Sequence, residues 1–255
     1  MKNTCGRDVT KFFLTIDGGN SLTKSALFDA NGELIEKGET DCAVLIQKRK
    51  LNPQNTLCAL VNVARSSVAR SSVELSNFKV FNVQDHFKGQ KFFEMPVHYS
   101  DSLGMDRLIL GYYFYDGESS AALVDSGTFT TVDLVDKDGF QGGHILPGLE
   151  LLLGNYDFGF KLKSLRPKDP ECLMTTNPQN SHDAIASGLT RSFVAPVQSI
   201  LEDCDFESLQ ITGGNGKILH KYLKSSPFQR SASIHFNPNL IHLGLLKFLN
   251  KAALA

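Results

Sequence analysis

The chain has 255 residues, of which 42% are hydrophobic and 21% are charged, and its net charge is −1 at pH 7. This balance of mixed signs removes any electrostatic case for nucleic acid or an anionic membrane as the main partner. No stretch approaches the ~20 consecutive apolar residues of a membrane span, and the polar residues 1–8 lack the apolar region of a signal peptide. We therefore expect a cytoplasmic protein with one large domain or two of about 125 residues.

The five cysteines and seven histidines are scattered along the chain. The cysteines are odd in number and form no C-x-x-C pair, so neither a disulfide framework nor a zinc cage is indicated. The histidines do not stand at the spacing of metal ligands, and we assign none of them to a metal.

The first predicted element is a β-hairpin over about residues 12–28. Its first strand ends in Asp17-Gly18-Gly19-Asn20-Ser21, and its second strand begins near Lys24 and closes at Asp29-Ala30-Asn31-Gly32. An Asp-x-Asn-Gly turn after an apolar strand is a strong hairpin signal. The glycines in the first turn let the backbone approach a ligand with its N–H groups, while Asp17 can hold a cation.

Three more strands are expected in the first half, at residues 33–39, 58–64 and 78–83. The first of them extends the hairpin into a meander. Residues 58–64 fit a buried strand or a helix by periodicity alone, and the Arg65-Ser66-Ser67 break favours the strand. Residues 51–54 are interpreted as a loop that leads into a helix.

A helix is predicted from Leu103 to Tyr115, where apolar residues recur at helical spacing, and it should cover the first sheet. The polar segment 117–120 follows and is the predicted linker. We therefore expect one domain over residues 1–118 and a second over residues 119–255.

The second half repeats the first. A hairpin over residues 121–135 contains Asp125-Ser126-Gly127-Thr128 at the end of its first strand and closes at Asp136-Lys137-Asp138-Gly139. One Asp-x-Gly turn is more often a simple corner between strands than a ligand site, but two copies with matching flanks favour a pair of phosphate-binding hairpins. Two such turns facing each other would hold a polyphosphate from both sides.

Further elements of the second half are predicted from caps and periodicity. They are a third strand near residues 142–146, a helix that opens at Pro147, a loop over residues 157–176, a long helix from the cap Asn180 to about Leu201, and a final helix over residues 239–249.

A strand at residues 209–212 ends in the turn Thr212-Gly213-Gly214-Asn215, and a helix opens at Lys217. Open α/β sheets bind ligands at the carboxyl ends of their strands. This turn is therefore a third candidate ligand loop. Since Gly213 and Gly214 have no side chains, a flat nucleoside ring could lie against the backbone there, although a tight helix start needs the same residues.

These motifs resemble a known family. The two hairpins and the Thr-Gly-Gly turn are similar to those of the superfamily that includes acetate kinases, sugar kinases, actin and Hsp70 chaperones. Within it, the chain most resembles type III pantothenate kinase. The matching motifs are D-x-G-N-[TS]-x-x-K from Asp17 to Lys24, G-x-D-R from Gly104 to Arg107, D-x-G-T from Asp125 to Thr128 with the further threonines Thr130 and Thr131, G-G-x-I-x-P-G-L from Gly142 to Leu149, Asn180-Ser181, the Thr-Gly-Gly turn, and Gly244-Leu245.

The resemblance implies a fold, an activity and partners. The fold is α/β, with two duplicated ribonuclease H-like domains of mixed sheets and flanking helices in an actin-like architecture. The activity is the ATP-dependent phosphorylation of pantothenate to 4'-phosphopantothenate, which begins coenzyme A synthesis. The implied cofactors are Mg²⁺ with ATP and a monovalent cation, K⁺ or NH4⁺. The family is dimeric through its second half, so a homodimer is expected.

The expected ATP site combines all three turns. Lys24 and the first turn should hold phosphate oxygens, Asp17 should keep Mg²⁺ near them directly or through water, and Thr128 should donate to phosphate from the other side. By resemblance alone, Asp125 binds the monovalent cation. The ATP-binding set is Asp17, Gly18, Gly19, Asn20, Ser21, Leu22, Thr23, Lys24, Thr128, Gly213 and Gly214.

The expected acceptor site comprises Gly104, Met105, Asp106, Arg107 and Ser181. An alcohol needs a base to take its proton, and Asp106 at a helix start is suited to this, the alternative being a simple helix cap. Arg107 can pair with the carboxylate of pantothenate, the alternative being a solvated helix charge. The role of Ser181 comes from the resemblance.

The chain departs from the family pattern at a few positions. Ser21 and Ser181 replace threonines but keep a hydroxyl, and Gly18 stands where a larger apolar residue is usual. The family places a substrate-contacting tyrosine seven residues before the glycine of G-x-D-R, where this chain has Val97. The nearest tyrosine is Tyr99, so the loop on the acceptor side is altered.

Two other functions remain open. One is a different small-molecule kinase of the same superfamily, acting on acetate or a sugar. The other is a non-catalytic regulator built on the same fold. The presence of Asp17, Lys24, Asp106 and Asp125 argues against the regulator, because a protein freed from catalysis has no physical reason to keep these charges.

Overall fold

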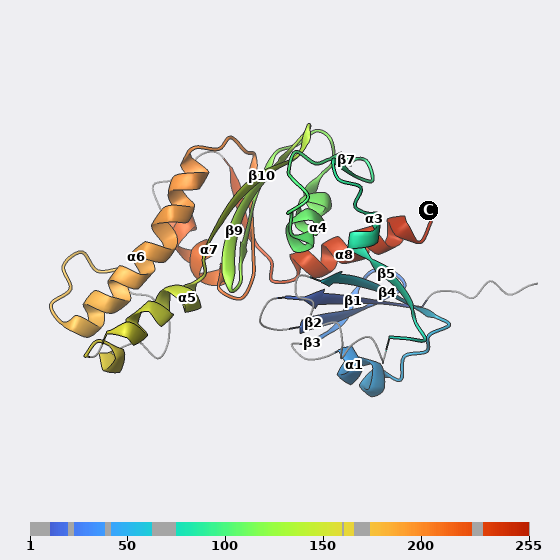
Figure 1. Ribbon diagram of the computed structural model, residues 1–255, viewed down its shortest axis with the longest axis horizontal. Coiled ribbons are helices and arrows are strands. Elements are labelled where there is room, and N and C mark those ends of the chain that lie inside the picture. The colour runs from blue at the N-terminus through green and yellow to red at the C-terminus, as the bar shows by residue number, and fades with distance from the viewer. Residues whose placement is uncertain are drawn as a thin grey trace, which may run out of the picture. The chain divides into compact units, whose positions relative to one another are not determined.

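The computed structural model describes residues 11–19, 23–38, 42–62, 75–159, 161–165, 174–225 and 232–254 (Figure 1). The contacts between residues divide the chain into two compact units. The first comprises Met1–Glu94, Ser100–Tyr113 and Leu240–Ala255, and the second comprises Met95–Tyr99 and Phe114–Asn239. In the described part of the chain, no helix is both long enough and apolar enough to cross a membrane.

A mixed five-stranded sheet in the order β3-β2-β1-β4-β5 forms the first unit. The first three strands make an antiparallel meander, and the last two add parallel to β1. The Asp29 carboxylate accepts hydrogen bonds of 2.9 Å from the N–H groups of Asn31 and Glu33, which fixes the turn after β2. The strands are β1 (Phe12–Gly18), β2 (Thr23–Asp29), β3 (Leu34–Gly38), β4 (Thr56–Asn62) and β5 (Lys79–Asn82).

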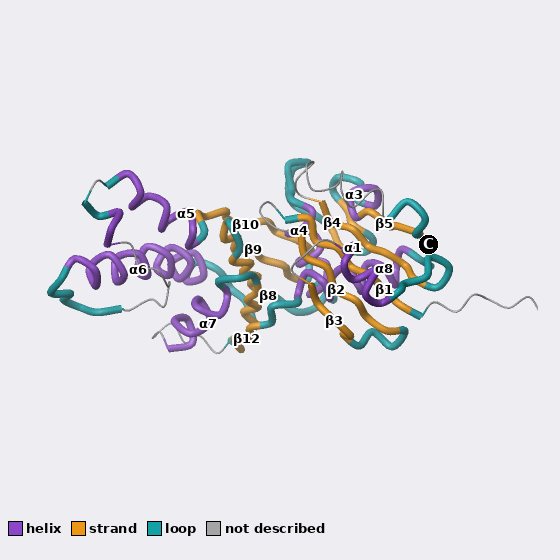
Figure 2. The backbone as a smooth tube through the Cα atoms, turned by 90° about the horizontal axis from the view of Figure 1, so that it is seen from below, coloured by secondary structure: helices purple, strands orange, loops and turns teal. Residues whose placement is uncertain are grey.

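Two helices cover opposite faces of this sheet, α1 (Cys42–Arg49) and α8 (Leu240–Ala252), below and above it in Figure 1. Leu14, Ile16 and Leu27 pack with α1, whereas the alternate residues Ala26 and Phe28 pack with α8. In Figure 2, as in Figure 1, α8 lies beside β1.

The remaining elements of the first unit follow β5 in the sequence, and the last of them begins within the G-x-D-R motif. They are α3 (Val83–His86), the short strand β6 (Lys91–Phe92) and α4 (Met105–Phe114). α4 approaches α8 where Ile109 lies against Gly244. The helix expected over residues 103–115 is therefore present, but α8 rather than α4 is the helix that lies on β1 and β4.

The second unit repeats the first topology, with a mixed sheet in the order β10-β9-β8-β11-β12. Again the first three strands are an antiparallel meander, and the last two run parallel to its first strand. The duplication inferred from two similar turns thus extends to the whole sheet. The strands are β8 (Ala121–Ser126), β9 (Phe129–Asp136), β10 (Gly139–Pro147), β11 (Ser208–Thr212) and β12 (Ser233–Phe236), with the short β7 (Met95–Pro96) also in this unit.

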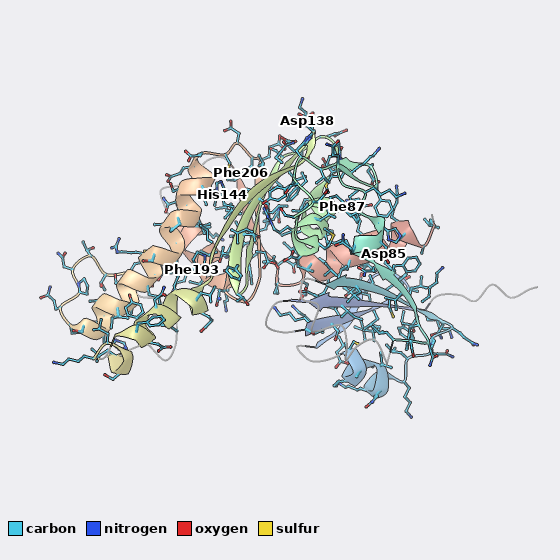
Figure 3. All side chains as sticks on the ribbon, viewed as in Figure 1. Asp85, Phe87, Asp138, His144, Phe193 and Phe206 are labelled. Carbon is cyan, nitrogen blue, oxygen red and sulfur yellow. The ribbon has the colours of Figure 1, made fainter. Side chains whose placement is uncertain are left out.

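Helices pack on one face of this second sheet. Phe193, labelled on α6 in Figure 3, is buried in an apolar core with Val124 and Ile211 of the sheet. The side chain of Asn180 caps α6 by accepting a hydrogen bond of 2.9 Å from the N–H of Asp183, as predicted. The helices are α5 (Leu149–Gly154), α6 (Ser181–Glu202) and α7 (Gly216–Ser225), with short 3-10 turns at Asn155–Phe158 and Lys163–Leu165.

Several predicted boundaries differ from the structure. No helix follows residues 51–54: α1 precedes them, and β4 follows them. β10 continues through Pro147, so α5 begins at Leu149 with Gly148 as its cap. Of the predicted loop at 157–176, residues 160 and 166–173 lie outside the described residues.

The last helix differs most from expectation. We expected residues 239–249 to close the second half, but α8 packs on β1 and β4 and so belongs to the first unit. The physical reason is its apolar face: Leu243 and Leu246 cover Ala26 and Phe28. The first unit therefore consists of three separate stretches of the chain.

Candidate functional site

The first ligand turn begins where β1 ends. Asp17 lies directly opposite Lys24 of β2, and Gly18 lies opposite Thr23. The structure therefore brings Asp17, Gly18, Gly19, Thr23 and Lys24 together around one turn. The predicted ligands Asn20, Ser21 and Leu22 lie outside the described residues.

The electrostatic environment of Asp17 links this turn to α4. The pKa of the Asp17 carboxyl is raised from 3.8 to about 6, mainly by burial and next by the charge of Asp106, while the charges of Lys24 and Lys37 act in the opposite direction. Asp17 and Asp106 thus lie in one electrostatic neighbourhood of the first unit, although they come from distant parts of the sequence. The end of β1 is close to the start of α4.

The start of α4 holds the acceptor motif. The Gly104 carbonyl accepts a hydrogen bond of 3.1 Å from the N–H of Leu108, so Asp106 lies in the first helical turn. Burial raises the pKa of Asp106, while hydrogen bonds from the backbone N–H groups of Arg107 and Asp106 lower it, as does the Arg107 charge. These bonds also fit the helix-cap alternative, since a carboxylate can cap the helix and still face a substrate.

Arg107 and Met105 are both buried, and each is 5% exposed. The alternative of a solvated helix charge for Arg107 is therefore wrong. A buried guanidinium requires an anionic or hydrogen-bonding partner, which is consistent with a role in holding a carboxylate.

In the second unit, the Asp125 turn packs against the Thr-Gly-Gly turn. Thr212 of β11 pairs with Asp125 of β8, and Gly213 has a φ of +89°. A Cβ on Gly213 would lie 2.5 Å from Asp125 Oδ1 and equally close to the backbone of Ser126. Two of the predicted ligand turns are thus in direct contact within the second unit.

The neighbouring Gly214 has open space around the position of a Cβ, with no atom of the described structure within 4 Å. Thr128, on the turn after β8, is half-buried, and its carbonyl accepts a hydrogen bond of 3.1 Å from the N–H of Gly148. Ser181, by contrast, is the exposed first residue of α6 and belongs to neither turn.

Thr131 belongs to the threonines that follow the D-x-G-T motif, but it was not among the predicted ligands. It lies directly opposite Asp125 on β9, and its buried Oγ1 has no hydrogen-bond partner among the described residues. A carboxylate and an unpartnered hydroxyl side by side are suitable oxygen ligands for a small cation. Two signals were available in the sequence: the match of Thr131 to the family motif, and the register of the hairpin, which places position 131 opposite position 125.

The structure shows how Val97 and Tyr99 pack in the altered loop before α4. Val97 is 2% exposed and bridges to Phe140, so it is a core residue. The Tyr99 ring lies against Gly142, whose φ is +89° and where a Cβ would be 2.7 Å from the ring. Tyr99 therefore packs on β10 at a bulge that needs glycine.

Comparison with known proteins identifies the family. Residues 13–203 match the family model described as type III pantothenate kinase. The chain belongs to this family. A type III pantothenate kinase from Flavobacterium psychrophilum is 30% identical, over 86% of this chain and 93% of its own length. Another from Flavobacterium johnsoniae is 28% identical, over 86% and 92% of the two chains.

Solved structures share the fold of this pantothenate kinase family member at lower identity. A Campylobacter jejuni protein described as a Baf family transcriptional activator has a TM-score of 0.58 at 21% identity, with 95% and 100% of the two chains covered. A Sinorhizobium meliloti protein described as a 2-dehydro-3-deoxygalactonokinase has a TM-score of 0.56 at 10% identity, with 94% and 99% covered. The predicted α/β architecture of paired mixed sheets with flanking helices is confirmed.

Proposed function

We propose that this protein transfers the terminal phosphoryl group of ATP to pantothenate and so forms 4'-phosphopantothenate, the first step of coenzyme A synthesis. The reaction is inferred from the family to which the chain belongs. One structural observation supports the roles that we give to individual residues. Asp17, at the phosphate turn, and Asp106, at the acceptor motif, lie within electrostatic reach of each other inside the first unit. A donor turn and an acceptor carboxylate so placed are what phosphoryl transfer to an alcohol requires.

The phosphate side of the reaction is assigned to the first turn. Phosphoryl transfer depends mainly on positioning and charge neutralisation, so Lys24 and the N–H groups around Gly18 and Gly19 hold phosphate oxygens. With a pKa of about 6, Asp17 is mostly ionised at pH 7 and is a suitable hard oxygen ligand for Mg²⁺. When bound, Mg²⁺ neutralises charge on the phosphates.

On the acceptor side, Asp106 takes the proton of the pantothenate hydroxyl. Burial raises its pKa toward the range in which a base both accepts and releases a proton readily, and two backbone N–H groups fix the carboxylate. Buried Arg107 pairs with the pantothenate carboxylate, next to Gly104 and Met105. Ser181 completes the acceptor set by analogy with the family.

The second unit supplies the rest of the nucleotide site. Thr128 donates to phosphate, and the adenosine lies on Gly213 and Gly214, where the space beside Gly214 supports this assignment. A monovalent cation, K⁺ or NH4⁺, binds at Asp125. The unpartnered hydroxyl of Thr131 supports this site as a second ligand.

We also propose a homodimer formed through the second unit. Several large apolar side chains there are exposed, most of all Phe158 at 91%. The others among the described residues of this unit are Phe129, Ile145, Leu151, Leu162 and Met174. Sedimentation of the wild-type protein at micromolar concentration tests this proposal, and a monomer would contradict it.

The test of function is a coupled assay of ATP consumption with pantothenate, with and without K⁺, on wild type, Asp106→Asn and the exposed control Asp101→Asn. We expect pantothenate-dependent turnover that requires K⁺ in the wild type, a rate about 10²-fold or more lower in Asp106→Asn, and an unchanged rate in the control. Turnover with acetate or glucose instead of pantothenate would favour another kinase of the superfamily. No turnover with any acceptor would favour a regulator.

A further inference from the structure

The α8 side of the first sheet carries polar residues beyond the predicted site. Thr15 of β1 pairs with Ala26 of β2, which pairs with Lys37 of β3. Directly opposite residues project to the same face of a sheet, and so do residues two apart on one strand. Lys37 therefore shares a face with Asp17 and Lys24.

His242 reaches this face from α8. It is 2% exposed, and its Nδ1 lies 2.9 Å from Thr15 Oγ1, while the Thr15 hydroxyl donates to the carbonyl oxygen of Ala26 at 3.3 Å. A hydroxyl has only one proton to donate, so Thr15 accepts its second bond from Nδ1–H. The other ring nitrogen, Nε2, therefore bears a lone pair and can only accept.

Nε2 of His242 is buried and has no hydrogen-bond partner within the described ranges. A buried polar atom without a partner is costly, and in native proteins it usually indicates a ligand, a water or a functional role. The donors that could serve Nε2 are on the same face of the sheet.

Two ammonium groups lie near this ring. The pKa of His242 is lowered to about 3, mainly by burial and then by the charges of Lys37 and Lys24. The ring is therefore neutral at physiological pH and keeps its lone pair.

We propose that Lys37 is a second cation for the phosphates of ATP, beside Lys24, and that His242 is its positioning residue. The lone pair on Nε2 draws the Lys37 ammonium toward the end of the sheet where Asp17 lies. By strand register Lys37 lies on the face of the sheet that bears Asp17 and Lys24. The inference rests on the proposed function in taking ATP as the ligand.

The need for a second cation follows from the charges at the site. Asp17 and Asp106 are both acidic, and a triphosphate adds several negative charges. Lys24 is the only cation that the motif of the first turn supplies. The half-buried Lys37 on β3, next to the strand that bears Lys24, adds a second positive charge on the same face.

The test measures binding of a non-hydrolysable ATP analogue, AMPPNP with Mg²⁺, by titration calorimetry in the absence of pantothenate. The variants are Lys37→Met, His242→Leu, His242→Gln and the double variant Lys37→Met with His242→Leu. Lys48→Met is the matched control, because Lys48 lies on α1 on the opposite face of the same sheet.

We expect Lys37→Met to weaken AMPPNP binding about tenfold and to reduce the dependence of binding on salt, because one phosphate-facing charge is lost. His242→Leu should weaken binding severalfold, and the double variant should bind no worse than Lys37→Met, because His242 acts through Lys37. His242→Gln should recover most of the affinity, since its side-chain oxygen is also an acceptor. In the kinase assay, the KM for ATP should rise while kcat changes less than about twofold.

Unchanged binding in Lys37→Met, additive effects in the double variant, or equal losses in His242→Gln and His242→Leu would each overturn the proposal. If His242→Leu does not fold, Lys37→Met and His242→Gln still decide the outcome. Binding of AMPPNP that depends on Lys37, in a protein without turnover of pantothenate, would refute the proposed reaction and keep this inference. Failure of the wild type to bind AMPPNP would refute both.

Discussion

Gly104 lies so close to Asp106 that a Cβ on the glycine would be 2.5 Å from Oδ1 of the aspartate. Since the clash is with the end of a side chain, Gly104→Ala can be accommodated only by moving the carboxylate. We expect kcat to fall about 10²-fold with little change in thermal stability, because an error of about 1 Å in a catalytic group has this effect. Steady-state kinetics and thermal unfolding measure the two quantities. Gly154→Ala is the control, since no atom of the described structure lies within 4 Å of its added Cβ.

The adjacent glycines Gly213 and Gly214 should respond differently to alanine. At Gly213 a Cβ would meet the backbone of Ser126 at 2.5 Å, and φ is +89°, so we expect a loss of roughly 1–3 kcal/mol or more in the free energy of unfolding. Gly214→Ala should leave stability nearly unchanged but weaken nucleotide binding, because the methyl would occupy the proposed adenosine surface. Denaturant unfolding and AMPPNP titration separate the two effects. Equal stability losses in both variants would contradict this account.

At neutral pH, the buried carboxylate of Asp17 should lower the free energy of unfolding of the protein. Its pKa is 3.8 in a model peptide and about 6 in the fold, so the folded state binds the proton more tightly than the unfolded chain. The resulting stability is complete below pH 3.8 and is lost as the pH rises through about 6. Asp17→Asn should therefore make the ligand-free protein more stable at pH 8, by at most about 3 kcal/mol, and by almost nothing near pH 4.

Urea unfolding of the wild type and Asp17→Asn at both pH values tests this, with the exposed Asp138→Asn as the control. A difference that did not grow between pH 4 and pH 8 would refute the assignment of the shift to Asp17. The same variant should lose Mg²⁺-dependent turnover, so stability and activity are expected to change in opposite directions.

Lys247 should stabilise the first unit through the end of α4. Its Nζ donates to the carbonyl oxygens of Tyr112 and Tyr113, at 2.7 and 3.2 Å, and lies 4.7 Å from the centre of the Tyr112 ring. Lys247→Met should reduce the free energy of unfolding by about 1–3 kcal/mol, since it removes charged hydrogen bonds and a cation–π contact. Lys251→Met, on the same helix, removes only an exposed ion pair of 3.3 Å with Glu94 and should cost less than about 1 kcal/mol. A reversed order of these two losses would be the contrary result.

The parts of the fold that could be predicted from the sequence are those fixed by local chemistry. Both hairpins close at turns that begin with an aspartate, Asp29 and Asp136, whose carboxylates accept from nearby backbone N–H groups. The cap of α6 by Asn180 is equally local. β12, in contrast, has only four residues, Ser-Ile-His-Phe, and this alternation of polar and apolar residues is too short to indicate a strand without the ladder to β11.

The parts that could not be predicted depend on tertiary packing. The apolar pattern of a helix does not determine which sheet the helix packs on, and α8 was therefore assigned to the wrong half. The same holds for buried polar residues. The helical pattern around Arg107 is the same for a buried and an exposed side chain, and the sequence around His242 does not show that its ring is buried against Thr15. The candidate turns were found because glycine and aspartate are needed at fixed spacing. Thr131 was part of the matched motif but was not selected as a ligand, because only strand register places it opposite Asp125, and Lys37 became visible through register alone.

The position of α8 has a consequence for biosynthesis. Residues Phe114–Asn239 emerge from the ribosome before α8 does, so the second sheet can fold while the first still lacks the helix that covers β1 and β4. Until translation has passed residue 252, the strand that bears Asp17 has one uncovered hydrophobic face. Because of this order of translation, the phosphate turn should be one of the last parts of the protein to reach its folded structure.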